Sequence, residues 1–70
     1  MKYKVGDLLI TKVDDIDITL KDNRYEFSKK NKFFLIVDCY NNEEYELISQ
    51  ETRGISEWTK GSIEQCFDKV

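Results

Sequence analysis

Lys32-Phe-Phe-Leu-Ile-Val-Asp-Cys-Tyr-Asn-Asn-Glu-Glu-Tyr-Glu-Leu-Ile-Ser-Gln50 is the stretch that decides the fold of this chain. Two runs rich in β-branched and aromatic residues flank a short polar segment, which is the pattern of a β-hairpin. Asn41 or Asn42 can adopt the left-handed backbone conformation that a tight hairpin turn requires. We therefore predict two antiparallel strands with a turn between them.

The length of that turn sets the register of the two strands. A two-residue loop would place Val37 opposite Glu46, whereas a three-residue loop at 41–43 places Val37 opposite Leu47 and Cys39 opposite Tyr45. We favour the three-residue loop because it gathers apolar side chains on one face. The predicted core face comprises Leu35, Val37, Cys39, Tyr45 and Leu47. The other face carries Phe34, Ile36, Tyr40 and Ile48 beside Asp38, Glu44 and Glu46, so it is only partly polar and something must cover part of it.

The size and charge of the chain limit what it can be. Its 70 residues make one domain, spanning 1–70, with a small core that buries roughly 60% of the unfolded surface. The chain has 11 basic and 14 acidic residues, a net charge of −3 and a pI near 4.8, so it lacks the overall basic character of a nucleic-acid binder. The acidic excess lies in residues 36–70, which hold eight acidic and three basic groups.

Two cysteines are too few to indicate a disulfide scaffold. Cys39 and Cys66 both lie among apolar residues and are expected to be small, buried hydrophobes in a reducing cytoplasm, although a bridge between them stays open. The first residues lack a long apolar stretch, so we expect no signal peptide and no transmembrane segment. The expected location is the cytoplasm of a bacterial cell or of a phage-infected host.

The remaining segments alternate between short strands and turns. We predict strands near 8–13, with Leu8 and Ile10 pointing inward, and near 16–20, 25–27 and 55–58. The turn at 51–54 is expected to use Gly54 as its residue with positive φ. Residues 59–67 favour one or two helical turns, because Thr59 or Ser62 can cap them and Ile63, Cys66 and Phe67 fall at helical spacing. Residues 68–70 form a closing edge strand or a tail.

This order of elements resembles a small SH3-like barrel of the kind found in bacterial and phage proteins. The resemblance rests on the opening Tyr3-Lys4-Val5-Gly6-Asp7, a long excursion after the first strand, the hairpin, a short strand that ends at Trp58, and a helical turn before the C-terminus. It implies an all-β fold: a small antiparallel SH3-like β-barrel of about five strands. The chain has no proline and lacks the aromatic and acidic motif of signalling SH3 domains, so polyproline binding is not expected. Trp58 loosely matches a binding aromatic of that family.

The residue content argues against enzymatic chemistry. The chain has no histidine, which removes the commonest general base and metal ligand, and two cysteines alone cannot form a tetrahedral zinc site. No glycine-rich loop has the spacing of a phosphate site. Asp15 and Asp17 could hold a hard cation, but such pairs also occur on ordinary acidic surfaces. We expect no enzyme activity, no cofactor and no metal.

Three surfaces compete as binding sites. The first is aromatic and comprises Tyr25, Phe27, Phe34, Tyr40 and Trp58, although small barrels also fill their cores with aromatic rings. The second is acidic and comprises Asp38, Glu43, Glu44 and Glu46, with Glu51, Glu57 and Glu64 as further members. The third is basic and comprises Lys29, Lys30 and Lys32, with Arg24 and Lys21. Such lysines bind phosphates in some barrels and prevent edge-to-edge aggregation in others.

The sequence therefore predicts a non-enzymatic protein-binding module. Its most concrete form is a phage-type or mobile-element accessory protein that binds and inhibits or modulates a larger host or phage protein. A partner with a basic surface would complement the acidic side chains. The predicted docking residues are Asp38, Tyr40, Glu44, Glu46 and Trp58. The alternative is a small nucleic-acid-binding barrel that uses Arg24, Lys29, Lys30 and Lys32. Self-assembly is a third hypothesis, and no membrane partner is expected.

Overall fold

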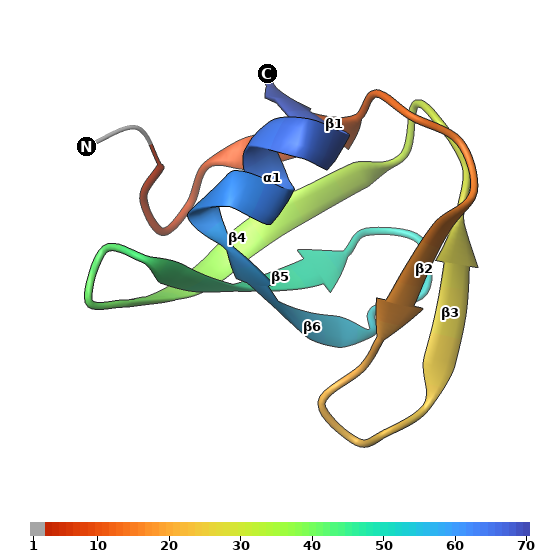
Figure 1. Cartoon of the computed structure of the whole chain (residues 1–70), viewed down its shortest axis with the longest axis horizontal. Helices are drawn as coiled ribbons and strands as arrows, with labels where there is room; N and C mark the ends of the chain where they lie inside the picture. The colour runs from red at the N-terminus through yellow and green to blue at the C-terminus, as the bar shows by residue number, and fades with distance from the viewer. Residues whose placement is uncertain (1–2) are drawn as a thin grey trace.

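The fold was taken from a computed structural model that describes residues 3–70, and within them the chain forms seven strands and one helix (Figure 1). The elements follow one another as β1 (Leu8–Thr11), β2 (Ile16–Thr19), β3 (Tyr25–Ser28), β4 (Phe33–Tyr40), β5 (Glu44–Ser49), β6 (Ile55–Thr59), α1 (Lys60–Cys66) and β7 (Phe67–Lys69). The all-β class and the short helix near the C-terminus are thus confirmed.

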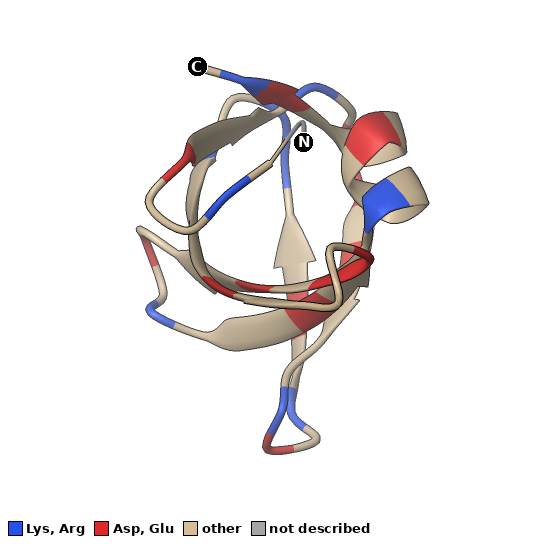
Figure 2. Ribbon diagram, turned by 90° about the vertical axis from the view of Figure 1, so that its left-hand side faces the viewer, with Lys and Arg blue, Asp and Glu red and all other residues tan. Residues whose placement is uncertain are grey.

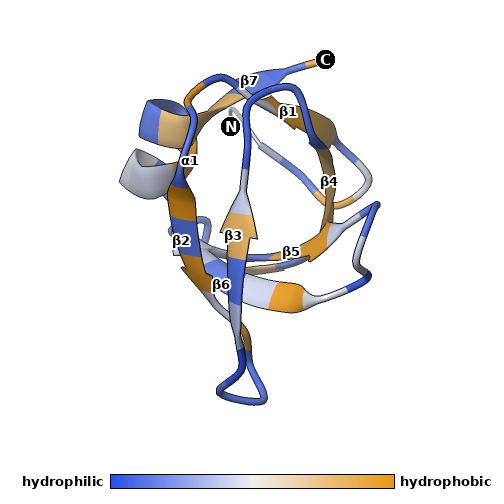
Figure 3. Cartoon of the chain, turned by 90° about the vertical axis from the view of Figure 1, so that its right-hand side faces the viewer, coloured by the Kyte–Doolittle hydropathy of each residue, from blue (hydrophilic) through white to orange (hydrophobic). Residues whose placement is uncertain are grey.

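The strands of the described residues form two antiparallel sheets. Five of them pair in the order β6-β5-β4-β1-β7, and β2 pairs with β3 in a separate hairpin. The single bridge between Leu20 and Ser56 links this hairpin to β6, and no ladder closes the sheets into a barrel. The expected count of about five strands therefore describes the larger sheet alone. Figures 2 and 3 look along the axis about which this sheet curls, so it has a concave inner face and a convex outer face.

The central hairpin has the three-residue loop that the sequence predicts. Cys39 pairs with Tyr45 and Tyr40 pairs with Glu44, which leaves residues 41–43 as the loop. Asn41 and Asn42 have φ values of 54° and 58°, so both asparagines take the left-handed conformation. The backbone N–H of Glu43 donates to the carbonyl of Tyr40 at 3.1 Å and closes the turn.

A β-bulge at Val37 corrects the predicted faces of β4. Ile36 pairs with Leu47 and Asp38 pairs with Glu46, so Val37 is an extra residue and does not lie opposite Leu47. An extra residue reverses the alternation of side chains along a strand. The predicted inner and outer faces of β4 are therefore correct for the residues after Val37 and wrong for Val37 and the residues before it. Phe34 and Ile36 are buried in the core. Leu35 and Val37 lie on the outer face instead of the inner one.

The same inversion occurs in β1. Leu9 and Thr11 are almost fully buried, whereas Leu8 and Ile10, which were predicted to point inward, are only half-buried. Leu9 pairs with Phe34, and Leu8 pairs with Leu35, so the two strands present matching faces to the core and to the outside.

The core lies between the inner face of the large sheet and the β2–β3 hairpin. Its members are Tyr3, Leu9, Ile16, Ile18, Leu20, Phe34, Ile36, Tyr45, Leu47, Ile63 and Phe67. The ring of Phe67 packs edge-on against Phe34 and against Trp58, with centroids 5.1 and 5.0 Å apart. Cys39 and Cys66 are free and half-buried at the margin of this core, so the structure shows neither the full burial that was expected nor the bridge that was left open.

Helix α1 begins and ends at defined contacts. The Thr59 hydroxyl accepts a hydrogen bond of 3.2 Å from the backbone N–H of Ser62, which is an N-cap. Ile63 is the buried residue of this helix, and Phe67 continues directly into β7. The helical interpretation of this segment is confirmed.

The turn before β6 differs from its prediction. Arg53, with a φ of 66°, is the residue in the left-handed region, and Gly54 is not. Gly54 is needed for a different reason: a Cβ placed on it would lie 2.9 Å from Leu20 Cδ2. The glycine lets β6 approach the β2–β3 hairpin closely.

Candidate functional site

The outer face of the large sheet carries a row of apolar side chains across four strands. Leu8 pairs with Leu35, Leu35 with Ile48, and Ile48 with Ile55, so the four residues lie side by side on β1, β4, β5 and β6. Directly paired residues point to the same face of a sheet. The buried row Ile36–Leu47–Ser56 on the neighbouring positions identifies the inner face, which places Leu8, Leu35, Ile48 and Ile55 on the outer one.

More apolar residues extend this row. Ile10 pairs with Phe33 beside it, and the bulge residue Val37 is close by. Phe33 is 44% exposed, and Val37 and Ile55 are each 37% exposed. Helix α1 lies on the opposite side of the molecule from β4 (Figure 3), and Ile16 and Ile18 of β2 pack into the inner face. We call Leu8, Ile10, Phe33, Leu35, Val37, Ile48 and Ile55 the outer apolar row.

An acidic area borders this row toward the 41–43 turn. Asp38 pairs with Glu46 and Glu46 with Glu57, which aligns three carboxylates across β4, β5 and β6. Tyr40 pairs with Glu44 and Glu44 with Thr59 in the next outer row. The predicted docking residues Asp38, Tyr40, Glu44 and Glu46 therefore share one face, and the bulge at Val37 puts Leu35 on the same face. The area also includes Glu57, and Figure 2 shows the acidic segments on these strands.

Like charges directly opposite one another destabilise a sheet, and one lysine offsets part of this cost. The ammonium of Lys21, from the turn between β2 and β3, donates a hydrogen bond to Oε2 of Glu46 and lies 4.0 Å from Oε2 of Glu57. The Tyr40 hydroxyl donates to the same Glu46 oxygen at 2.7 Å. Glu46 is only 8% exposed, so the hydrogen bonds from these two donors stabilise its negative charge.

The ionisation of these groups follows from their contacts. The hydrogen bond from Lys21, together with that from Tyr40, lowers the pKa of the Glu46 carboxyl below its ordinary value. The same contact with Glu46 raises the pKa of the Lys21 ammonium and of the Tyr40 phenol. The face therefore carries one lysine, Lys21, beside four acidic side chains, Asp38, Glu44, Glu46 and Glu57.

A pocket of about 220 Å³ opens over β5 and β6 at this acidic area. Its lining residues are Tyr40, Glu44, Tyr45, Glu57, Trp58 and Thr59. Tyr45 and Trp58 pair with each other, and Tyr45 is fully buried on the inner side. The outer walls therefore come from Tyr40, Glu44, Glu57 and Thr59.

Trp58 is not the exposed aromatic anchor that the sequence predicts. It is half-buried, its ring packs on Phe67, and its indole N–H donates to the Ser56 hydroxyl at 2.7 Å. Its contacts are those of a core residue that also reaches the pocket. Of the other aromatic candidates, Phe34 is buried, Tyr40 is 40% exposed, and Tyr25 and Phe27 are strongly exposed on β3.

The four predicted nucleic-acid contacts do not form one site. Arg24 lies at one end of β3, and Lys29, Lys30 and Lys32 lie at the other (Figure 3). Arg24 is paired with Asp22 at 2.7 Å, Lys29 with Asp15 at 2.9 Å and Lys32 with Glu51 at 3.4 Å. These pairs neutralise three of the four cations locally.

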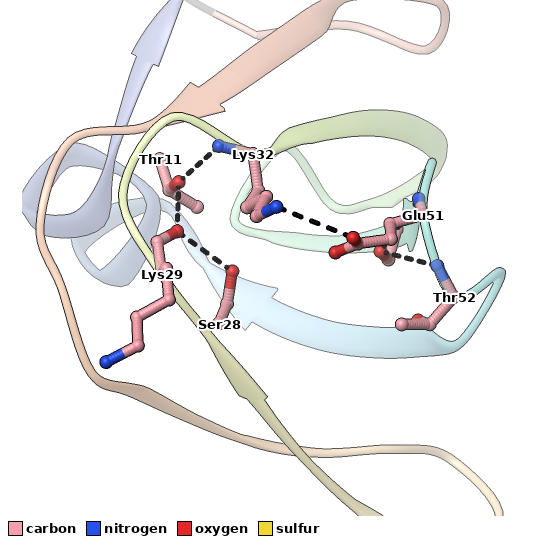
Figure 4. A network of polar contacts seen from close by, with 7 residues as sticks. Thr11, Ser28, Lys29, Lys32, Glu51 and Thr52 are labelled. Carbon is pink, nitrogen blue, oxygen red and sulfur yellow. Dashed lines mark hydrogen bonds and ion pairs between the residues drawn. The ribbon is translucent and has the colours of Figure 1, made fainter.

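The 29–32 turn is also fixed by its backbone. Thr11, which is 1% exposed, donates its hydroxyl to the Lys29 carbonyl at 2.7 Å and accepts from the Lys32 N–H at 2.8 Å (Figure 4). The Lys30 N–H donates to Asp14 Oδ1 at 2.9 Å. The turn is a well-anchored connection between β3 and β4.

Sequence reasoning missed the outer apolar row because it placed Leu8 and Leu35 inside. A signal was present: 33–37 of β4 is apolar at every position, which is typical of a strand that is covered on both faces. A strand of this type is expected to be covered on its outer face as well as on its inner one.

Residues 3–70 offer neither a metal-binding cluster nor a membrane-spanning helix. No three side chains of His, Cys, Asp or Glu gather there in an arrangement that could bind a metal ion. The helix of this region is also too short to span a membrane.

Comparisons with known proteins give no family assignment. No family model matches the chain, and no curated protein and no solved structure matches it either.

Proposed function

We propose that this protein is a non-enzymatic protein-binding module that docks through the outer face of its large sheet. The observation that carries the proposal is the in-register row Leu8–Leu35–Ile48–Ile55 on the outer face. Contiguous apolar surface on a small protein marks an interaction site, because its burial against a partner is favourable.

The acidic area beside the row specifies the partner. A partner that covers the outer apolar row would bring its rim against Asp38, Glu44 and Glu57. An apolar patch bordered by lysine or arginine residues complements this surface, and the opposite charges would speed association. The predicted docking residues Asp38, Tyr40, Glu44 and Glu46 belong to this surface, and Glu46 acts in it mainly by holding Lys21 and Tyr40 in place.

The proposed architecture is an SH3-like barrel that stays partly open, since a single bridge joins the β2–β3 hairpin to β6. The sheet order β6-β5-β4-β1-β7, the β2–β3 excursion after the first strand and the helix before the last strand support that resemblance. By analogy, we propose that the chain acts as a phage-type or mobile-element accessory protein in the cytoplasm, where it binds and inhibits or modulates a larger protein with a basic surface. Fold analogy alone supports this part of the proposal.

A capture experiment with paired variants tests the docking face. The chain is tagged, incubated with an extract of the cells that produce it, and the bound proteins are quantified by mass spectrometry. The double variant Val37→Lys with Ile55→Lys changes two side chains of the outer apolar row that are each 37% exposed. Phe27→Lys is the matched control, because it removes an equally apolar, 62% exposed side chain from β3.

We expect a discrete protein to be recovered by the wild type and by F27K, and at least tenfold less of it by V37K/I55K. Thermal unfolding of the three proteins serves to check that each is folded. Recovery of no protein above background, or equal losses in V37K/I55K and F27K, would contradict docking at this face.

Nucleic-acid binding at β3 is a second candidate, supported by one observation. Tyr25 and Phe27 are 82% and 62% exposed, and Lys29 Nζ lies 5.9 Å from the centroid of the Phe27 ring. Exposed aromatic rings beside lysines can stack bases and bind phosphates. A mobility-shift titration with single-stranded DNA and RNA tests it. Retardation would favour this candidate over protein docking if it is weakened both by added salt and by the double substitution Lys29→Gln with Lys30→Gln. The absence of any retardation would remove the candidate.

A further inference from the structure

We propose that the pocket over β5 and β6 binds one cationic side chain of the docked partner, with arginine preferred over lysine. This inference rests on the proposed function, since the side chain would belong to a protein that covers the outer apolar row. The pocket walls are Tyr40, Glu44, Glu57 and Thr59.

The size of the pocket points to a side chain as its occupant. Pockets for drug-sized ligands usually measure about 300–1,000 Å³, and this one measures about 220 Å³. It lies beside the outer apolar row on the same strands, because Glu44 and Glu57 share β5 and β6 with Ile48 and Ile55. A partner that covers the row can therefore reach the pocket with one residue.

The charges around the pocket favour a cation. Lys21 is the lysine that lies within ion-pairing distance of this face, and its ammonium is bonded to Glu46. Its distance to Glu57 is 4.0 Å, at the limit of an ion pair, and Glu44 forms no ion pair among the described residues. Lys60, which follows Thr59, forms none with these carboxylates either. Glu44 and Glu57 thus keep most of their capacity to accept hydrogen bonds from a further cation.

Tyr40 gives the pocket an aromatic wall with a fixed position. Its hydroxyl is bonded to Glu46 at 2.7 Å, so the ring is held over β5 before any partner arrives. A guanidinium can stack on such a ring while it donates to carboxylates at its edge, because it is planar and presents five donors. An ammonium could use the carboxylates but has no plane to stack, which is why arginine should bind better.

The probe for this site is N-acetyl-arginine methylamide, and its neutral analogue N-acetyl-citrulline methylamide is the control ligand. The two have nearly the same shape and differ in charge. Binding is followed by the backbone amide shifts of the isotope-labelled protein. We expect the arginine probe to shift the amides of Glu44, Glu57 and Thr59 saturably, and the citrulline analogue to bind at least about fivefold more weakly.

Three variants locate the contacts. Glu44→Gln, Glu57→Gln and Tyr40→Leu should each weaken the arginine probe about two- to fivefold, in line with single exposed ion pairs and cation–π contacts. Glu51→Gln, which removes a carboxylate paired with Lys32 outside the pocket, should leave its affinity unchanged.

The inference is overturned if the citrulline analogue binds equally well, if the shifts are scattered over the surface, or if E44Q and E57Q bind the probe like the wild type. These outcomes are distinct from failure of the proposed function. If the probe fails but V37K/I55K still loses the captured protein, docking at the outer face stands and the pocket assignment falls. If the probe binds but no protein is captured, protein docking falls, and with it the assignment of the occupant to a partner; the pocket's preference for a guanidinium is then all that stands.

Discussion

The hydroxyl of Tyr40 and the ammonium of Lys21 both donate to Oε2 of Glu46, which joins the central hairpin to the β2–β3 turn. One oxygen therefore connects both strands of the central hairpin to a turn that lies far from them in the sequence. The contact explains how three carboxylates, Asp38, Glu46 and Glu57, can lie in register across adjacent strands. It also leaves the two carboxylates on either side of Glu46, those of Asp38 and Glu57, available for a partner.

Replacement of Glu46 by glutamine should destabilise the protein in a pH-dependent manner. The contacts with Lys21 and Tyr40 lower the pKa of Glu46 below its ordinary value of 4.5. A lowered pKa in the folded state means that the ionised group stabilises the fold above the unfolded pKa and that this contribution is lost as the pH falls through the folded pKa. The stability difference between wild type and E46Q should therefore be constant near neutral pH and shrink below pH 4.5.

Urea unfolding of both proteins between about pH 7 and about pH 3 measures this difference. Glu51→Gln removes a more exposed carboxylate and is the matched control. A difference that grows as the pH falls, or that E51Q reproduces, would show that the contacts of Glu46 do not have the assigned role.

Replacement of Tyr40 by phenylalanine removes one hydrogen bond and keeps the ring. Because the acceptor is a charged, mostly buried carboxylate and Tyr40 itself is partly exposed, we expect a loss of about 1 kcal/mol in the free energy of unfolding. Chemical denaturation at neutral pH measures it. No measurable loss would mean that the hydroxyl does not hold the ring in place.

Gly54 and Gly61 should respond oppositely to alanine. A Cβ on Gly54 would lie 2.9 Å from both Leu20 Cδ2 and Glu26 Oε2, so G54A should lose about 1–3 kcal/mol of stability through overpacking. A Cβ on Gly61 meets nothing within 4 Å, and the residue is in α1, so G61A should gain up to about 1 kcal/mol. Thermal unfolding of both variants checks the pair. Equal effects would contradict the close approach of β6 and Leu20.

Thr11 should be sensitive to loss of its hydroxyl. Thr11→Val leaves the part-buried Lys32 N–H without the acceptor that it has at 2.8 Å from the buried Thr11 hydroxyl, so the variant should lose about 2 kcal/mol of stability. Thr11→Ser keeps both hydrogen bonds and should lose less. Thr19→Val, on the exposed face of β2, should be close to neutral. If T11V were as stable as T19V, the hydroxyl would not be what anchors the 29–32 turn.

Local sequence chemistry predicted the turns and caps of this fold well. Asn41 and Asn42 indicated the hairpin turn, and Thr59 indicated the start of the helix, because each of these features depends on one or two side chains next to the backbone that they shape. The wrong choice of Gly54 as the left-handed residue has a different cause. Arg53 adopts that conformation, and the need for glycine comes from Leu20, which is distant in the sequence.

Which face of a strand is buried could not be read where both faces are apolar. In 33–37 of β4, the side chains on both faces of the strand are hydrophobic. Only the bulge at Val37 and the pairing of Phe34 with Leu9 decide that Phe34 and Ile36 are inside. Beyond the bulge, polar residues alternate clearly, which is why Asp38, Tyr40, Glu44 and Glu46 were correctly placed together. The outer apolar row depends on four strands in register, and no single segment encodes it.

Site-specific photo-crosslinking tests the docking face most directly. A photoreactive phenylalanine is placed at Val37 in the outer apolar row or, as the control, at Phe27 on β3, and each protein is irradiated in the cells that produce it. The account predicts a discrete crosslink to another protein from position 37 and none of the same size from position 27. Crosslinks from position 27 alone, crosslinks to nucleic acid, or crosslinks from position 37 only to a second copy of this chain would contradict it.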